Sequence, residues 1–323
     1  MDPAQFFAAS RLVIVAGKGG VGKTTVSAAL ACAAARMGLS TLIIEVEGKS
    51  GLASLFGNEP LTYEEVTLAP GGGPDGAAEI RGRALTPDDA LVEYLRDHGL
   101  SRISKRLVSS GALDVVATAA PGIKDILILG KVKQLERAGT ADLLILDAPA
   151  AGHAITFLLS ARGLLDAVRV GPINSQARDV LEMLTDHARC QVMLVTLPEE
   201  TPVNELVDTA YHLEDRVGVA LGPVVVNGLY PTLAGLDADP EAAAAAASTT
   251  LRAGEADALR AAADFRRHRI ALQQEQVERL AAELPLPQLH LPYVFNADLG
   301  PPELDELASA LLTAIDDLHE SRR

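Results

Sequence analysis

The sequence predicts an α/β protein built on a doubly wound, mainly parallel sheet. Short aliphatic runs recur along the chain, and each is followed by a turn and then by a segment of helical composition. The runs are apolar on both faces rather than alternating, which is typical of strands buried in a parallel sheet. Strands that alternate with helices imply right-handed crossovers, which place helices on both faces. The predicted strands are residues 12–16, 41–46, 143–147, 191–196, 223–226 and 288–291.

The predicted helices follow from composition and from start and stop signals. Residues 21–37 form a helix that Gly38 closes, because glycine tolerates the left-handed conformation common after helix ends. Asp239 and Pro240 are typical of a helix start, so the alanine run 242–247 is expected to open a surface helix. The last helix, 302–319, has an apolar stripe and an acidic opposite face, which favours core packing over a membrane surface.

Residues 85–140 interrupt the alternation of strands and helices. Three segments in this region have a helical pattern, and no strand is predicted among them: 90–95, 100–108 and 124–136. We interpret 85–140 as a helical insertion within a single domain that spans 1–323. Just before it, residues 67–83 contain a glycine-rich run, which indicates an exposed hairpin or a flexible loop.

Composition argues against several classes of function. The 323 residues include 28 Lys and Arg against 43 Asp and Glu, a formal charge of −15. Because nucleic acids and anionic membranes are also negatively charged, neither is an expected partner. No apolar run approaches the ~20 residues that cross a bilayer, and the start of the chain lacks the pattern of a signal peptide. Cys32 and Cys190 form neither a disulfide framework nor a zinc pattern. We expect a cytoplasmic protein with no integral membrane segment and no zinc.

The motif that carries most chemistry is the glycine-rich run GKGGVGKTT, directly after the first predicted strand and at the start of a predicted helix. It satisfies G-x-x-x-x-G-K-[ST], the P-loop pattern, in the context that this pattern requires. Its glycines let backbone N–H groups surround phosphates, and the helix N-terminus adds positive potential. Lys23 is expected to reach the β- and γ-phosphates of ATP or ADP, and Thr24 to ligate Mg²⁺. The predicted nucleotide-binding residues of the loop are Gly17, Gly19, Gly20, Val21, Gly22, Lys23, Thr24 and Thr25.

A second lysine, Lys18, makes the loop a deviant Walker A motif. With the whole motif present, the sequence resembles the ATPase family that includes the arsenical-pump ATPase and the eukaryotic targeting ATPase for tail-anchored membrane proteins. The resemblance implies that Lys18 and Lys23 are catalytic, and that Lys18 reaches across a dimer interface to the partner's nucleotide. The alternative for Lys18 is a surface lysine that contacts no nucleotide.

Further matches extend the resemblance over most of the chain. Asp147 ends a predicted strand and is followed by Gly152-His153, which looks like the family's second switch. The resemblance implies that Asp147 is catalytic and contacts the water shell of Mg²⁺, and that Gly152 senses the γ-phosphate. It also implies that Asn227 reads the adenine and that Pro292 and Tyr293 wall the base. An ordinary strand-end turn is the alternative at 147–153.

The first switch departs from the family pattern. Where the family has an Asp-Pro-Ala-His run, this chain has Glu47 in the position of the Asp that orients the attacking water. A glutamate keeps the carboxylate but places it one methylene further out, so hydrolysis is expected to be weaker. Glu45 shares a face with Glu47 if the strand continues, so either residue is a candidate, unless both are solvent-facing acids.

The resemblance implies an Mg-ATP-dependent dimeric ATPase of an actinobacterial-type branch, associated with targeting, chaperone or transport work. Its partner is expected to be a second copy or a paralogue, and a hydrophobic client is a further candidate. The cysteine clusters that hold zinc or arsenite in family members are absent. The alternative is a nucleotide-gated client- or partner-binding protein with little or no turnover. A positioning ATPase of the septum or plasmid-partition kind is the third reading, and the acidic last helix argues against it.

Overall fold

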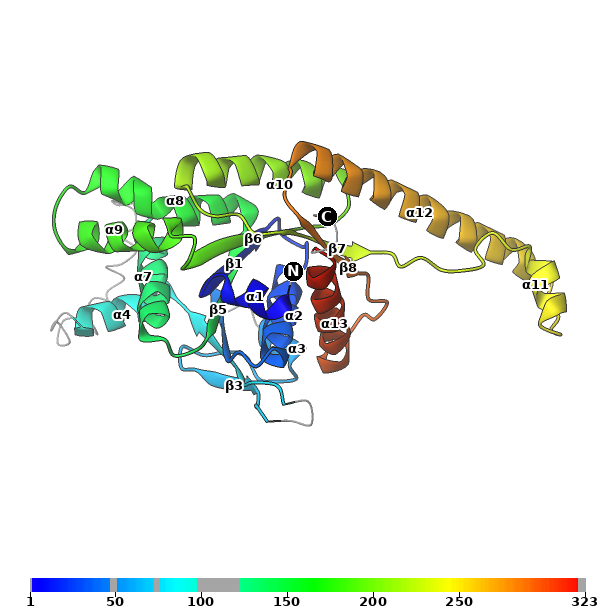
Figure 1. Cartoon of the computed structure of the whole chain (residues 1–323), viewed down its shortest axis with the longest axis horizontal. Helices are drawn as coiled ribbons and strands as arrows, with labels where there is room; N and C mark the ends of the chain where they lie inside the picture. Colours follow the sequence, from blue (N-terminus) through cyan, green and yellow to red (C-terminus); the bar gives the residue numbers. More distant parts are fainter. Residues whose placement is uncertain (1, 47–50, 73–75, 98–121, 319–323) are drawn as a thin grey trace.

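Eight strands form one sheet in the computed structural model, which describes residues 2–46, 51–72, 76–97 and 122–318 (Figure 1). The strand order is β3-β4-β2-β5-β1-β6-β7-β8. All neighbouring strands are parallel except β3 and β4, which are antiparallel. The strands are β1 (Leu12–Gly17), β2 (Thr41–Val46), β3 (Val66–Ala69), β4 (Ile80–Leu85), β5 (Leu143–Ala150), β6 (Cys190–Thr196), β7 (Val224–Leu229) and β8 (Gln288–Pro292). The predicted α/β fold with a mainly parallel sheet is confirmed, and each of the six predicted strands is present.

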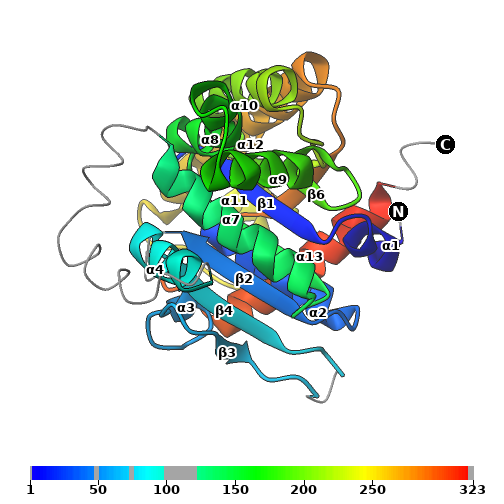
Figure 2. The ribbon, with the colours of Figure 1, turned by 90° about the vertical axis from the view of Figure 1, so that its left-hand side faces the viewer.

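Helices cover both faces of this sheet, so the winding is double (Figure 2). One face packs against α7 (Ile123–Ala138), α8 (Ala151–Ala167), α9 (Pro172–Thr185) and α10 (Glu200–His212), which continues into a π-helical turn, η1 (Leu213–Val217). The other face packs against α1 (Pro3–Ala8), α2 (Lys23–Arg36), α3 (Gly51–Leu55) and α13 (Pro301–Asp317). Continuous apolar strands are explained by this arrangement, because neither face of the central strands meets water.

Helix α2 packs against the sheet, with α13 and α3 beside it on the same face. Its composition suits this crowded position. Nine of its residues between Val26 and Ala35 are buried, and most of them are alanines. Small side chains let a helix approach neighbours on several sides at once. The predicted apolar stripe of the last helix is also confirmed, since its buried residues are Leu304, Leu307, Ala308, Leu311 and Ile315.

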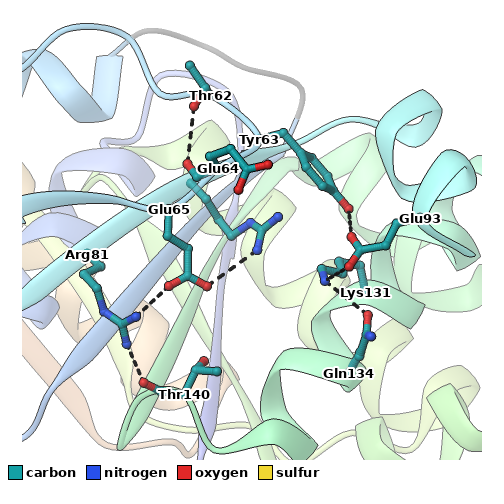
Figure 3. Close-up of polar contacts among 10 residues, drawn as sticks. Thr62, Tyr63, Glu64, Glu65, Arg81, Glu93, Lys131, Gln134 and Thr140 are labelled. Carbon is teal, nitrogen blue, oxygen red and sulfur yellow. Dashed lines mark hydrogen bonds and ion pairs between the residues drawn. The ribbon is translucent and has the colours of Figure 1, made fainter. Parts of the chain in front are cut away.

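Strands β3 and β4, from the segment predicted at 67–83 as a hairpin or loop, pair antiparallel and belong to the main sheet. Strand β4 pairs in parallel with β2. Because it contains Arg81 and Arg83, β4 resembles a polar loop in the sequence. The Glu65 carboxylate forms ion pairs with both guanidinium groups, with Arg81 at 2.6 Å (Figure 3) and with Arg83 at 3.5 Å. Tyr63 stacks on the Arg83 guanidinium as well. Arg83 is thereby able to lie buried within the sheet.

The helices predicted at 90–95 and 124–136 lie within α4 (Pro87–Asp97) and α7, whereas 100–108 falls outside the described residues. Helix α7 has many buried residues and packs beside α8 and α9. The division of the chain into one domain with an insertion at 85–140 stays a prediction.

Two helices between β7 and β8 project from the body as an arm (Figure 1). They are α11 (Pro240–Ala246), which the Asp239 side chain caps by accepting from the Ala242 N–H as predicted, and α12 (Glu255–Glu283). Along α12 the buried residues are Gln273, Val277 and Leu280, all in its second half. Neither these nor the other helices of the described residues combine the length and apolar character that crossing a bilayer requires.

Candidate nucleotide site

The P-loop joins the carboxyl end of β1 to the start of α2, and its glycines are sterically required. A Cβ at Gly17 would lie 2.3 Å from the Val195 carbonyl oxygen, on the neighbouring strand β6. Gly20 and Gly22 have φ values of +85° and +90°, which side chains rarely tolerate. Gly22 is also the N-cap of α2 and has no side chain to accept from the first helical N–H groups. Those donors therefore face the loop, as an anion site requires.

The Lys23 ammonium folds back over the loop and donates to the carbonyl oxygen of Lys18 at 2.9 Å. The side chain thus crosses the cradle that the backbone N–H groups surround. Lys18 itself takes a different direction. Its ammonium forms an ion pair with Glu205 of α10, at 2.6 Å.

Thr24 and Asp147 meet at the centre of the site although 123 residues separate them. The Thr24 hydroxyl donates to Asp147 Oδ2 at 2.6 Å, and the Ser27 hydroxyl donates to Oδ1 at 3.4 Å. Asp147 follows the apolar part of β5, opposite Val15 of β1, which explains why it arrives beside the loop. Ser27 was not predicted as a site residue. Its position one helical turn after Thr24, on the same face of α2, is the signal that could have identified it.

A second carboxylate lies beside Asp147. Glu45 of β2 is in register with it, and both alternate with neighbours that face the opposite cluster of apolar residues, so both side chains point toward α2. Glu45 is 2 % exposed and Asp147 is 8 % exposed. The solvent-facing alternative is therefore wrong for Glu45. Glu47 lies outside the described residues.

The donor set at this point fits a magnesium ion. Mg²⁺ prefers oxygen ligands and is commonly bound by one or two carboxylates together with phosphates. Thr24 and Asp147 supply a hydroxyl and a carboxylate within hydrogen-bond distance of each other, next to the phosphate cradle.

Asn227 lies at the end of β7 and is tied to the P-loop. Its side-chain amide donates to the Val21 carbonyl oxygen at 2.9 Å, and a Cβ on Gly22 would lie 2.3 Å from that nitrogen. Strand β8 runs beside β7, which places Pro292 at the same edge of the sheet as Asn227.

Tyr293 belongs to an aromatic cluster that the sequence analysis did not foresee. Its ring centroid lies 5.1 Å from that of Tyr230 and 4.7 Å from that of Phe295. The Arg266 guanidinium stacks on the rings of Tyr230 and Phe295, at 5.6 and 5.1 Å from their centroids. Of the two predicted base-wall residues, Tyr293 lies in this aromatic cluster and Pro292 ends β8. Their contact with a base stays a prediction.

Gly152 and the two cysteines, which the sequence analysis also singled out, lie outside the aromatic cluster. Gly152 falls in the first turn of α8, directly after β5. Cys190 is buried in the core and Cys32 is half-buried at its margin. Burial raises the pKa of Cys32 to about 11 and that of Cys190 to about 12. Burial thus favours the neutral thiol at both positions.

Comparisons with known proteins agree with this geometry. The family model described as an anion-transporting ATPase matches residues 10–168, which include the P-loop and Asp147. ATPase BagA of Mycobacterium tuberculosis is 32% identical over 93% of this chain and 92% of its own length. The arsenical pump-driving ATPase of Escherichia coli is 27% identical over 68% of this chain and 35% of that protein. ATPase get3 of Schizosaccharomyces japonicus is 31% identical over 45% of this chain and 42% of that protein.

The resemblance that the P-loop suggested is confirmed, including its actinobacterial-type branch, because the mycobacterial match spans nearly all of both chains. The P-loop, the Asp147 strand and that match lead to one conclusion: the chain belongs to the anion-transporting, ArsA-type ATPase family.

Proposed function

We propose that this chain binds and hydrolyses Mg-ATP and works as a dimer. The observation that carries the proposal is the contact between Thr24 and Asp147, at 2.6 Å, beside a cradle of backbone N–H donors. A hydroxyl and a carboxylate in this position suit a metal-bound triphosphate. The ATPases among its relatives support the same reading.

In this proposal the loop residues bind and orient the triphosphate. The Lys23 ammonium leaves the Lys18 carbonyl, which it contacts at 2.9 Å, and binds β- and γ-phosphate oxygens. Thr24 and Asp147 would hold Mg²⁺, which supplies positive charge against the phosphate oxygens. The donors at the start of α2 stabilise the charge that develops during transfer.

The attacking water needs a carboxylate that orients it. Glu47 is the candidate from the family pattern, and Glu45 is the candidate that the described residues offer. Glu45 lies buried beside Asp147, on the sheet face that α2 covers. Because water must be held in line with the bond that breaks, a longer glutamate side chain is expected to slow hydrolysis.

The remaining parts of the proposal concern the partner subunit. Closure of two subunits over nucleotide would bring Lys18 to the phosphates bound by the partner subunit. Gly152 would sense whether a γ-phosphate is bound. Loss of that phosphate would release the switch segments and reopen the dimer. The partner is a second copy or a paralogue, and the client is a hydrophobic segment or a transport component in the cytoplasm.

Calorimetric titration of Mg-ATP tests the binding step. The wild-type chain is expected to bind, and Lys23→Ala is expected to lose at least about tenfold in affinity because a charge-assisted phosphate contact is removed. Arg252→Ala, which removes an exposed cation on the arm, is the control and is expected to bind like the wild type. Equal binding by Lys23→Ala and the wild type would contradict the site.

One observation favours a second candidate, a nucleotide-gated binding protein with little turnover. A groove of about 960 Å³ runs along the arm between α11 and α12. Exposed apolar side chains line it, including Leu233, Leu259 and Phe265. A hydrophobic dye whose fluorescence changes between the ADP and ATP states would support this candidate, and identical fluorescence in all states would exclude it.

A further inference from the structure

Lys18 is held inside its own subunit by a carboxylate. Its ammonium lies 2.6 Å from Glu205 Oε1, and the side chains are 36% and 45% exposed. The pair joins two elements that neighbouring strands bring together. Lys18 follows β1 and Glu205 lies on α10 after β6, and Gly17 of β1 is in register with Val195 of β6.

Glu205 stands on a fixed base. Its helix buries Val203, Leu206 and Ala210 in the core. On its outer side, α10 is attached to α12: Arg279 donates to the Asn204 side chain at 2.6 Å and to the Glu200 carbonyl oxygen at 3.2 Å. Core packing therefore holds α10, and with it the backbone of Glu205, in place.

Lys18 stands on a base that moves more readily. It lies between Gly17 and Gly19, which have no side chains to pack against neighbours, and Gly19 and Gly20 are exposed. Its side chain is partly exposed, so solvent and ligands reach the ammonium. The lysine is thus the partner that can leave the pair.

We propose that Glu205 is a latch, a positioning residue that keeps Lys18 paired within its own subunit until a nucleotide phosphate replaces the Glu205 carboxylate as the partner of the ammonium. The inference rests on the proposed function, in which Lys18 binds phosphate. The Glu205 carboxylate and the phosphate then compete for the Lys18 ammonium, so Lys18 contacts phosphate only after the Lys18–Glu205 ion pair has broken. The latch keeps Lys18 from acting without nucleotide and weakens the apparent affinity for ATP.

A double-mutant cycle on Lys18 and Glu205 tests the latch. The apparent dissociation constant for Mg-ATPγS is measured by calorimetry for the wild type, Glu205→Gln, Lys18→Ala and the double variant. Glu205→Gln is expected to bind up to about fivefold more tightly, the range that a partly exposed ion pair supports. In the Lys18→Ala background the same change is expected to have no effect, because no lysine is left to release.

A simple loss of negative charge gives a different pattern. If Glu205 only repels the phosphates, Glu205→Gln tightens binding to the same degree with and without Lys18, and the latch is refuted. Glu199→Gln is the matched control: Glu199 is the N-cap of the same helix and pairs with Arg269 at 2.5 Å, with side chains 42% and 36% exposed. The control is expected to bind like the wild type, and an equal gain in Glu199→Gln would also refute the latch.

The experiment separates failure of the latch from failure of the proposed function. Wild-type binding of Mg-ATPγS with an unchanged constant in Glu205→Gln refutes the latch and leaves the nucleotide site standing. A wild-type chain that binds no Mg-ATPγS refutes the proposed function and the latch together. Thermal melting of all variants shows whether each remains folded, and Glu205→Asp, which keeps the charge, is expected to bind close to the wild type.

Discussion

The P-loop side of the molecule and the α11–α12 arm are stabilised by different interactions. Helix α2 is buried along most of its length against the sheet, with α13 packed beside it. Residues 255–272, more than half of α12, include no buried side chain, and the structure describes all of them. The arm relies on exposed ion pairs instead, such as those that Arg267 makes with Asp237 and Asp264.

The difference matters for function because the two regions meet at the candidate site. Burial of α2 and of the central strands fixes Thr24 and Asp147 relative to one another, and catalysis of phosphate transfer depends on such fixed positions. Exposed ion pairs contribute little to stability and are screened by salt, so they stabilise the outer part of the arm much less than burial stabilises α2. The aromatic cluster of Tyr230, Tyr293 and Phe295 lies at the boundary between the two.

Truncation of one buried and one exposed leucine gives the largest contrast. Leu30 of α2 is 1% exposed, and Leu30→Ala is expected to lower the free energy of unfolding by about 2–5 kcal/mol through lost burial and a cavity. Leu259 of α12 is 50% exposed, and Leu259→Ala is expected to change it by less than about 0.5 kcal/mol. Urea titrations measure both values. Similar losses in the two variants would show that the arm is packed in solution.

Addition of a methyl group to a glycine sharpens the contrast at the site itself. Gly17→Ala places a Cβ 2.3 Å from a backbone oxygen, so we expect a loss of about 1–3 kcal/mol and weaker binding of Mg-ATP. Gly254, at the start of α12, has φ +83° and open space around it. Gly254→Ala is expected to cost about 1 kcal/mol of backbone strain and to leave nucleotide affinity unchanged. Unaltered affinity in Gly17→Ala would contradict the steric argument.

The ion pair of Glu93 and Lys131 in the body is more buried than the ion pairs of Arg267 in the arm. The smallest expected effect is the pH dependence that this buried pair gives to the free energy of unfolding. Burial disfavours the Glu93 carboxylate, but hydrogen bonds from Lys131 and Tyr63 outweigh it and hold the pKa below 4.5, the ordinary value (Figure 3). Lys131 itself is 9% exposed. A lowered pKa stabilises the folded chain above the ordinary value, and this contribution disappears as the pH falls through the folded value.

The matching variant is Glu93→Gln, which has no carboxylate to protonate. The difference in free energy of unfolding between the wild type and Glu93→Gln is expected to be largest at neutral pH and to shrink below pH 4.5. Urea titrations over this range measure it. A difference that stays constant with pH would contradict the role given to the Glu93 charge.

Local pattern and strand-end geometry were enough to predict the central part of the site. GKGGVGKTT identifies its own turn and helix, and Asp147 reaches Thr24 because parallel strands present their carboxyl ends at one edge. The sequence could not reveal β4 as a sheet strand, since the charges of Arg81 and Arg83 are neutralised by Glu65 from another segment. Glu205 was not predicted for a similar reason. It is 187 residues from Lys18 in the sequence, and no local pattern around either residue indicates that they pair.

The most direct test of the central claim is steady-state hydrolysis of Mg-ATP by the purified chain, with Lys23→Ala and the arm variant Arg267→Ala beside it. The site described here predicts turnover by the wild type, a loss of about 100-fold or more in Lys23→Ala, and unchanged turnover in Arg267→Ala. Hydrolysis by Lys23→Ala at the wild-type rate would contradict the assignment of this loop as the ATPase site.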